Sequence, residues 1–207
     1  MFEFIDVEQN SDEWFELRAG RLTSSKLGVV MANYGKAFGE PAKKYAVNIA
    51  IEQITGEPIP STFTNAHMER GHEQEPIARE LYENNTFSDV TNGGFFDCGF
   101  VGCSPDGMVG DDGVIEIKSV IASVQFANVK RGKIDPAYYW QCVGNLKFTG
   151  SQWLDFISYS SEFPVDKQLF VHRIHAVDLA DEFDKIDTRV DEFKILVAQS
   201  KEIILNS

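Results

Sequence analysis

The chain has 207 residues, of which 43% are hydrophobic and 12% aromatic, and this composition excludes a wholly disordered protein. No apolar run approaches the ~20 residues that span a bilayer, and the first residues lack the basic and apolar regions of a signal peptide. The three cysteines, an odd number, argue against a disulfide framework. We therefore expect a cytoplasmic protein with reduced thiols and no membrane partner.

The formal net charge of −13 argues against a protein that coats nucleic acid, because phosphate binding needs clustered lysine and arginine. The charge is unevenly spread along the chain. Residues 51–112 carry 2 basic and 12 acidic side chains, whereas residues 113–175 carry 7 basic and 5 acidic ones. A metal site could use some of the acidic residues, and a local positive surface is compatible with an acidic protein.

The first 85 residues show the helical spacing of apolar side chains. One helix is predicted at 11–19, behind a capping serine or aspartate, and a second at Thr23–Met31. Longer helices are predicted at Lys43–Thr55, which ends at a glycine, and at His67–Glu83. We therefore expect a helical N-terminal part over about residues 8–85.

From about residue 88 the pattern changes to that of β-structure. The predicted elements are strands at Val90–Phe96 and Gly99–Gly102, a loop at Gly107–Gly113, a buried strand at Val114–Val120, a helix at Pro136–Lys147, strands at Trp153–Tyr159 and Leu169–Ile174, and a long helix at Leu179–Ile204. This order indicates one domain over residues 1–207 of the α/β or α+β class. Its mixed central sheet would cover about 88–175 and its closing helix about 179–205.

One short stretch places two carboxylates and a lysine together. Asp106 ends a predicted strand at the turn Ser104-Pro105-Asp106-Gly107. Glu116 and Lys118 stand two apart on the next strand, where their side chains share a face. A hairpin brings Asp106 beside Glu116, and two such carboxylates repel each other unless a cation lies between them. Their oxygens suit Mg²⁺ or Mn²⁺, and Lys118 could orient the attacking water or stabilise negative charge on phosphorus.

A purely structural interpretation of this stretch is also open. The turn is a common one, and a Glu-x-Lys pair on an edge strand is often only solvated. The functional interpretation gains from the apolar residues that alternate with Glu116 and Lys118. If that strand is central, two charges lie where charge is costly without partners.

The stretch resembles the core of PD-(D/E)xK nucleases. Five motifs in order resemble, more narrowly, the phage lambda exonuclease and YqaJ-type viral recombinase family over about residues 8–150. The motifs are Trp14–Gly20 with Leu22–Ser25, Gly71–Pro76, Cys103–Gly107, Ile115–Lys118 and Tyr139–Gln141. The resemblance implies a restriction-endonuclease-like core, in which helices flank a mixed central sheet.

The resemblance also implies roles for individual residues of the core. Asp106, Glu116 and the main-chain carbonyl of Ile117 would bind one or two Mg²⁺ ions, with Mn²⁺ as a substitute. Lys118 would be the catalytic lysine. Glu75 would be an additional catalytic acid that approaches the metal.

Further positions match residues of the family that contact DNA. Arg18 and Ser25 would hold a terminal 5′-phosphate, which fits a bidentate guanidinium and a hydroxyl near a helix N-terminus. Ser104 and Gln141 are weaker candidates for DNA contacts. Lys130 and Arg131 are also weaker candidates, because their basic cluster could equally be a solvated loop.

Two positions depart from the family pattern. The family usually has Gln-x-Gln in the late helix, but this chain has Val143 at the second place, followed by Gly144 and Asn145, which could compensate. Asp97 lies near a family aspartate with a spacing shift of one residue, and is a weak site candidate.

The function implied is a metal-dependent 5′-to-3′ exodeoxyribonuclease that acts on linear duplex ends and gives 3′ overhangs for strand annealing. The resemblance further implies a homotrimeric ring, a phage single-strand annealing protein as partner, and a phage or prophage origin in a bacterial cytoplasm. Three alternatives stay open: a structure-selective endonuclease on the same core, a non-catalytic DNA-end binding module, and a metalloenzyme for small phosphate esters.

Overall fold

The computed structural model describes residues 2–59 and 66–207, with the side chains of 66–69 and 72 left out. Its strands are β1 (Glu3–Ile5), β2 (Leu22–Thr23), β3 (Val90–Thr91), β4 (Phe95–Cys98), β5 (Val101–Cys103), β6 (Gly107–Val109), β7 (Gly113–Ser119), β8 (Trp153–Tyr159) and β9 (Leu169–His175). Its helices are α1 (Asp12–Arg18), α2 (Ser24–Met31), α3 (Glu40–Thr55), α4 (Ala66–Thr86), α5 (Ala122–Arg131), α6 (Tyr139–Thr149) and α7 (Ala180–Leu205). The expected α/β class is confirmed.

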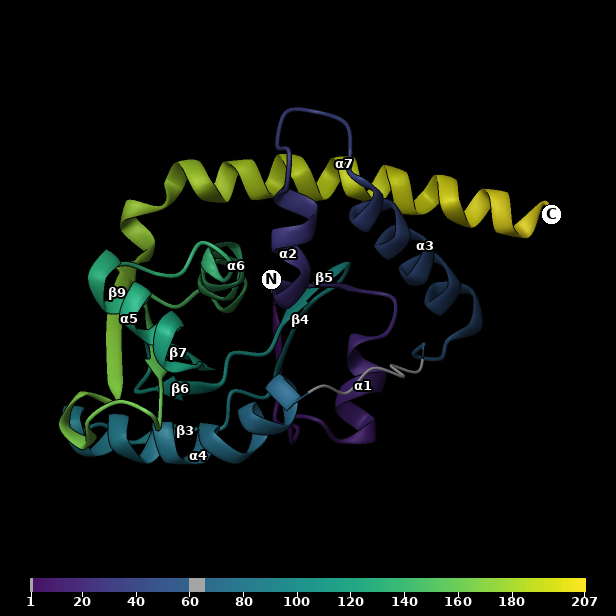
Figure 1. The fold of residues 1–207 in the computed structure, drawn as a ribbon. Coiled ribbons are helices and arrows are strands. Elements are labelled where there is room, and N and C mark those ends of the chain that lie inside the picture. The colour runs from purple at the N-terminus through teal and green to yellow at the C-terminus, as the bar shows by residue number, and fades with distance from the viewer. Residues whose placement is uncertain (1, 60–65) are drawn as a thin grey trace.

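The strands form two mixed sheets rather than one. The larger sheet has the order β3-β6-β7-β8-β9, in which β7 runs antiparallel to β6 and parallel to β8. The smaller sheet has the order β1-β4-β5-β2, so β1 and β2 add strands to the N-terminal part, which we had expected to be helical. Helix α7 runs along one side of the molecule, and α4 lies along the opposite side (Figure 1).

Strand β7 is the central strand that the alternating pattern predicts. Its even-numbered and odd-numbered side chains face different helices, as the two-residue period of a strand requires. Val114 belongs to the main core, in which α2, α3, α6 and α7 pack against one face of the sheets. Ile115 and Ile117 belong to a second cluster with Tyr82 of α4. Glu116 lies on the same side of β7 as Val114 and is completely buried.

The predicted loop at 107–113 is shorter than expected, because β6 pairs with β7 there. Gly107 lies opposite Ile115, and Val109 lies opposite Gly113. Hairpin hydrogen bonds therefore prevail over a turn-rich composition, and only residues 110–112 reverse the chain, with Gly110 at a positive φ of 59°. This register brings the residue before Gly107 beside the middle of β7.

Helix α5 was missed by the sequence analysis, which treated the residues around 130 as a loop. Its pattern is inverted, because Gln125 and Asn128 are buried whereas Phe126 and Val129 are exposed. The buried amides bond to Ser158 of β8. Apolar periodicity cannot find a helix whose polar side chains face the sheet.

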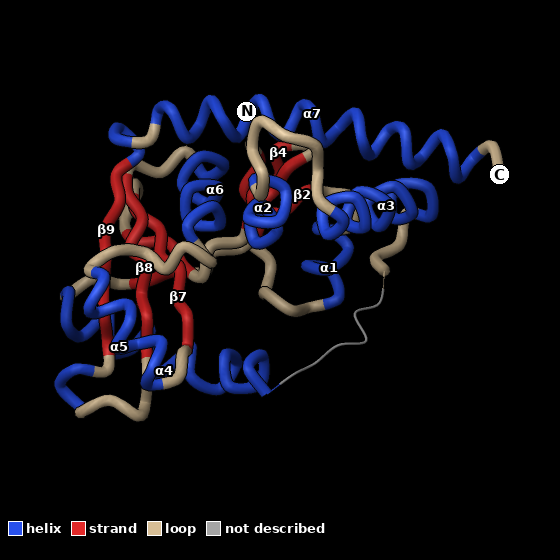
Figure 2. Tube along the Cα trace, turned by 45° about the horizontal axis from the view of Figure 1, so that its top comes forward, coloured by secondary structure: helices blue, strands red, loops and turns tan. Residues whose placement is uncertain are grey.

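The other helices begin and end close to their predicted residues. Figure 2 shows the helices, in blue, around the strands, in red. Helix α3 begins three residues earlier than expected, at Glu40, with a proline in its first turn. Among the described residues, no helix is both long and apolar enough to cross a membrane. The three cysteines are free thiols.

Candidate active site

The first residue of the site is Asp106, which lies between β5 of the smaller sheet and β6 of the larger one. The backbone N–H of Asp106 donates to the carbonyl of Ile115 at 3.0 Å. The backbone N–H of Ile117 donates to Asp106 Oδ2 at 2.6 Å. These two bonds fix the carboxylate against β7, beside the position of Glu116.

The N-terminal segment holds the turn that carries Asp106. Trp14 Nε1 donates to Ser104 Oγ at 2.8 Å, and Gln9 Nε2 donates to the carbonyl oxygen of Pro105 at 2.8 Å. A Cβ atom at Gly93 would overlap that same carbonyl, so the close approach of these two segments of the chain requires glycine. The hydroxyl of Ser104, a weak candidate for DNA contact, is thus engaged inside the protein.

Glu116 is the most heavily bonded side chain of the site. Its carboxylate accepts hydrogen bonds from Lys118 Nζ and from Gln141 Nε2 at 2.6 Å on one oxygen. Its other oxygen accepts from Asn145 Nδ2 at 2.7 Å. The structure therefore places Gln141 on the carboxylate, and Asn145, one turn later on α6, supplies a second amide. Val143, where the family pattern has glutamine, is buried in the main core.

The carboxylates of the site hold their protons unusually strongly. Burial, and then the charge of Asp106, raises the pKa of Glu116 to about 8 and the pKa of Glu75 to about 7. Burial also raises the pKa of Asp106. Burial alone would lower the pKa of Lys118, but the negative charges of Glu116 and Asp106 outweigh it and raise that pKa. The carboxylates beside Lys118 therefore favour its cationic form.

A cleft of about 510 Å³ lies at this site, between α4, the end of β7 and the loop before α6. Its lining includes Arg70, Glu75, Ile117, Lys118, Ile121 and Tyr138. Lys118 Nζ lies 5.3 Å from the centre of the Tyr138 ring, and Arg70 donates to the carbonyl of Ser119 at 3.4 Å. The cleft thus brings Glu75 from α4 together with the β7 residues that the sequence predicted.

The donor set of the cleft fits a hard divalent cation. In the part of the chain that the structure describes, no three or more histidine, cysteine, aspartate or glutamate side chains are grouped as a ready-made metal site. Mg²⁺, however, needs only one or two protein carboxylates, because water and substrate phosphate complete its shell. Asp106 and Glu116 supply two carboxylates, one partly and one completely buried, and burial raises the pKa of both. Glu75 could contribute a third.

A second group of side chains lies where α1 meets α2. Arg18 Nη2 donates to Ser25 Oγ at 3.2 Å and to Thr23 Oγ1 at 3.4 Å, and the two hydroxyls lie 3.1 Å apart. The guanidinium lies over the Trp14 ring at 4.0 Å. We call Arg18, Thr23 and Ser25 the phosphate cluster, after the role that the sequence resemblance implies for Arg18 and Ser25. Its charge interacts with Glu116, so the cluster is within electrostatic reach of the carboxylates. Thr23 was missed by the sequence analysis, which named Arg18 and Ser25.

Comparison with family models decides the relationship of the chain. Residues 13–152 match the model of the YqaJ-like viral recombinase domain. The chain belongs to the YqaJ-like viral recombinase family. The matched residues contain the phosphate cluster, the carboxylates and the amides of α6. A search of curated proteins found no match.

Solved structures support the same relationship. An alkaline exonuclease from Laribacter hongkongensis is 32% identical with a TM-score of 0.78, over 95% of this chain and 99% of that one. Its complex with dAMP is also 32% identical, with a TM-score of 0.80 and the same coverage. A phage-related exonuclease from Haemophilus somnus 129PT shares the fold at 17% identity, with a TM-score of 0.63 over 90% of this chain and 96% of that one. The homology supports a nuclease of the YqaJ-like family.

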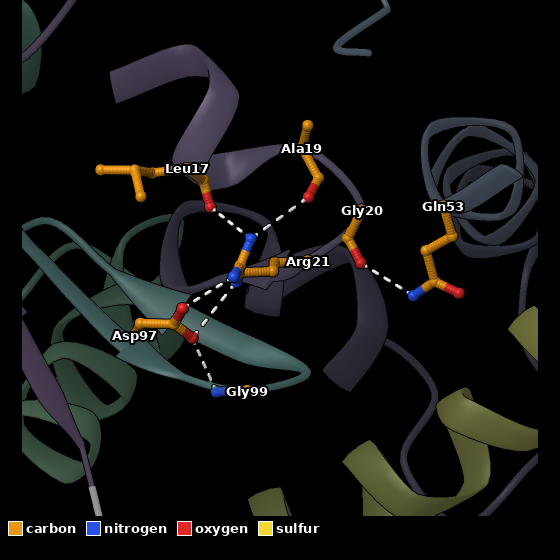
Figure 3. Close-up of polar contacts among 7 residues, drawn as sticks. All are labelled: Leu17, Ala19, Gly20, Arg21, Gln53, Asp97 and Gly99. Atoms are coloured by element: carbon orange, nitrogen blue, oxygen red, sulfur yellow. Dashed lines mark hydrogen bonds and ion pairs between the residues drawn. The ribbon is translucent and has the colours of Figure 1, made fainter. Parts of the chain in front are cut away.

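The structure gives Asp97 a partner outside the cleft (Figure 3). Arg21 binds its carboxylate through two bonds, Nε to Oδ1 at 3.2 Å and Nη2 to Oδ2 at 2.7 Å. Arg21 also donates to the carbonyl of Leu17 at 2.8 Å, and the N–H of Gly99 donates to Asp97 at 2.8 Å. Asp97 therefore ties the chain between α1 and β2 to the β4–β5 hairpin.

Substitution of Asp97 tests whether its role is structural. We expect Asp97→Ala to lower the free energy of unfolding by about 1–3 kcal/mol, because a bidentate, partly buried pair is lost. The folded fraction should still cleave DNA at close to the normal rate. Urea denaturation and a digestion assay at the same temperature would measure both. A stable variant without activity would instead place Asp97 in the catalytic machinery.

The remaining candidates for DNA contact lie on α5. Lys130 is exposed in its last turn. Arg131 donates to Asn128 Oδ1 at 2.8 Å and lies 4.0 Å from Asp135, so part of its binding capacity is used within the protein. These residues form the end of a helix rather than a loop.

Proposed function

We propose that this chain is a metal-dependent exonuclease that degrades the 5′-terminated strand of linear double-stranded DNA and leaves 3′ single-stranded overhangs. The observation that carries the proposal is the placement of Asp106, Glu116 and Lys118 beside a separate phosphate cluster. One group suits hydrolysis of a phosphodiester, and the other suits a terminal phosphate. The homology to an alkaline exonuclease over almost the whole chain supports the same activity.

The residues of the cleft have distinct tasks in this proposal. Asp106, Glu116 and the carbonyl of Ile117 would hold Mg²⁺, or Mn²⁺ in its place, and Glu75 would approach a second ion. The bound ion would activate water and stabilise the charge that develops on phosphorus. Lys118, in its cationic form, would stabilise the same charge and orient the water. Glu75, with its pKa near 7, is suited to accept a proton at neutral pH.

The phosphate cluster would set the direction of degradation. A 5′-phosphate bound by Arg18 and Ser25 leaves the next phosphodiester to reach the carboxylates, and each cut creates a new 5′-phosphate for the cluster. A homotrimeric ring around the duplex, a phage single-strand annealing protein as partner, and action in a bacterial cytoplasm belong to the same proposal. A basic lumen inside an acidic ring would reconcile DNA binding with the net charge of −13.

A digestion assay tests the proposal. Wild type and Lys118→Ala would be given Mg²⁺ and three substrates: linear duplex with 5′-phosphate, linear duplex with 5′-hydroxyl, and closed circular DNA. We expect loss of linear DNA alone, faster with 5′-phosphate, and no loss with the variant. Cleavage of circles would indicate an endonuclease, and binding without cleavage a non-catalytic end-binding module. Turnover of a small chromogenic phosphodiester in preference to DNA would indicate the small-ester enzyme.

Removal of the guanidinium from the phosphate cluster should abolish the preference for phosphorylated ends. We expect Arg18→Ala to lower kcat/KM about tenfold or more on 5′-phosphorylated duplex, because a charged, bidentate contact is lost. The rate of the first cut on 5′-hydroxyl duplex, whose end lacks the partner, should change little. Single-turnover release of the first nucleotide from each substrate would measure the ratio. An equal loss on both would assign Arg18 a role other than binding the terminal phosphate.

The raised pKa values predict an alkaline pH dependence. Metal binding requires deprotonated carboxylates, and the pKa values of Glu75 and Glu116 are about 7 and about 8. At limiting Mg²⁺, cleavage should therefore rise between about pH 6 and pH 8.5, and its midpoint should move to lower pH as Mg²⁺ is raised. Without metal the sign reverses for stability: the folded state holds protons that the unfolded state has released, so Tm should fall over this range. A flat pH profile of cleavage at low Mg²⁺ would contradict the first expectation. A Tm that does not fall with pH in the absence of metal would contradict the second.

A further inference from the structure

Two consecutive residues of α6 contact different sites. One contacts a carboxylate of the active site, and the other contacts the helix that carries Ser25. Asn145 donates to the buried carboxylate of Glu116. Gly144 lies against Ser24 and Leu27 of α2, the helix whose first turn carries Ser25. Consecutive helical residues point about 100° apart, so one turn of α6 can face β7 and α2 at once. Helices α6 and α2 lie side by side in the molecule (Figure 1).

Gly144 allows α2 to approach closely. A Cβ atom at this position would overlap Leu27 Cδ1 and lie 3.0 Å from Ser24 Oγ. Leu27 is completely buried and Ser24 nearly so, so neither side chain can turn out into solvent. A side chain at residue 144 would therefore have to be accommodated by repacking of Leu27 within the core or by an outward shift of α2, which would carry Ser25 with it.

The phosphate cluster is sensitive to such a movement because its members come from different elements. Arg18 ends α1, whereas Thr23 and Ser25 flank the first residue of α2. The hydrogen bonds of Arg18 to the two hydroxyls are already 3.2 and 3.4 Å long. A displacement of α2 by a few tenths of an ångström would open the cluster.

Asn145 is held in place by the carboxylate that it contacts. Its side chain is completely buried, with Nδ2 bonded to Glu116 Oε2 at 2.7 Å. Among the described residues its Oδ1 atom has no hydrogen-bond partner. A buried acceptor left unbonded carries a cost in stability, so the contact with Glu116 is the one that this side chain is placed to make.

We propose that Gly144 and Asn145 are positioning residues that fix the distance between the 5′-phosphate and the bond that is cut. Gly144 sets the place of α2 and hence the geometry of the phosphate cluster. Asn145 sets the orientation of the Glu116 carboxylate toward the cation. The inference rests on the proposed function, and it extends that function by naming α6 as the spacer between the two sites.

The test separates the two residues by binding measurements that need no turnover. Without divalent metal, we expect Gly144→Ala to reduce the ratio of affinities for 5′-phosphate over 5′-hydroxyl duplex about tenfold, because small misplacements of a binding group are costly. Its affinity for Mn²⁺, measured by calorimetry on the free protein, should stay within about twofold of wild type. For Asn145→Leu the expectation is reversed: Mn²⁺ binding about tenfold weaker, as for lost supports of metal ligands, with a normal phosphate ratio.

A matched glycine on the same helix pair gives the control. A Cβ atom at Gly28 of α2 would lie 3.9 Å from the carbonyl of Ala137, which is ordinary contact. Gly28→Ala should therefore leave both the phosphate ratio and the Mn²⁺ affinity unchanged. Shortening the obstructing side chain in the double variant Leu27→Ala, Gly144→Ala should restore much of the phosphate ratio, and this variant also serves if Gly144→Ala folds poorly.

The outcomes distinguish this inference from the proposed function. Parallel loss of both binding properties in each variant would overturn it, because a general loss of structure does not separate them. A normal phosphate ratio in Gly144→Ala would overturn it as well. Suppose that wild type prefers 5′-phosphate duplex, that Gly144→Ala loses only this preference and that Asn145→Leu loses only Mn²⁺ affinity. The positioning role of α6 is then supported even if digestion does not show the proposed direction. If wild type digests DNA as proposed but the variants do not split, only the spacer is lost.

Discussion

Lys118→Ala is expected to lower kcat for DNA cleavage by about 10²–10³-fold, the range seen when one group that stabilises developing charge is removed. The substitution removes a cationic side chain beside Glu116 and Asp106. Binding of duplex DNA without metal should remain within a few-fold of wild type. Single-turnover cleavage and anisotropy of a labelled duplex would measure the two quantities. Lys194→Ala, a lysine paired with Asp191 on α7, is the matched control.

The same variant separates two ways in which Lys118 can act. Loss of its charge raises the pKa of Glu116 further, so part of the defect reflects weaker metal binding. That part should disappear at higher pH and saturating Mg²⁺. We expect a defect of at least tenfold to persist there, because Lys118 also acts on the substrate. Full recovery of kcat under those conditions would show that Lys118 works only through Glu116.

The grouping of Asp106, Glu116 and Lys118 could be predicted because its information is local. Asp106, Glu116 and Lys118 lie within 13 residues, and a two-residue strand period with one hairpin is enough to bring them together. Burial of Glu116 follows from the apolar residues on either side of it. The structure adds that β7 is central, which turns two charges in an apolar run into a completely buried carboxylate paired with a partly buried lysine, both with raised pKa values.

The partners of these residues could not be predicted in the same way, because they come from distant segments. Asn145 reaches Glu116 only through the parallel β7–β8 crossover that carries α6, and Thr23 reaches Arg18 through a turn between two short elements. Asp97 was a candidate site residue because of its position in the motif order, but in the structure its carboxylate forms a salt bridge with Arg21. Helix α5 was missed because its buried side chains are polar.

The phosphate cluster depends on a helix whose far end is held by a residue about 160 positions away in the sequence. Arg189 of α7 is almost completely buried, and its guanidinium lies 3.6 Å from the centre of the Phe38 ring. The burial of Arg189 could not be predicted from the sequence, since an arginine within a long amphipathic helix is typical of its solvent-exposed face. In the structure it is the link between the closing helix and α2.

Arg189→Leu is expected to lower the free energy of unfolding by about 3–5 kcal/mol, the cost of breaking a buried charged network on one side. The guanidinium donates to the carbonyls of Val30 at 2.9 Å, Lys36 at 3.1 Å and Ala32 at 3.3 Å, and to Glu192 at 2.6 Å. Leucine has similar bulk but leaves these carbonyls, which lie at the end of α2 and in the turn that follows it, without this donor. Urea denaturation would measure the change.

The half-exposed partner of Arg189 provides the comparison for this prediction. Glu192→Ala removes one hydrogen bond whose carboxylate can otherwise bind water, so we expect a loss of about 1 kcal/mol. If the two variants lose stability equally, the carbonyls of α2 are not what Arg189 holds. If Arg189→Leu alone is strongly destabilised, and its folded fraction also loses the preference for 5′-phosphate ends, then α7 fixes α2 from one end as α6 does from its side. The place of the terminal phosphate would then depend on two helices that never touch it.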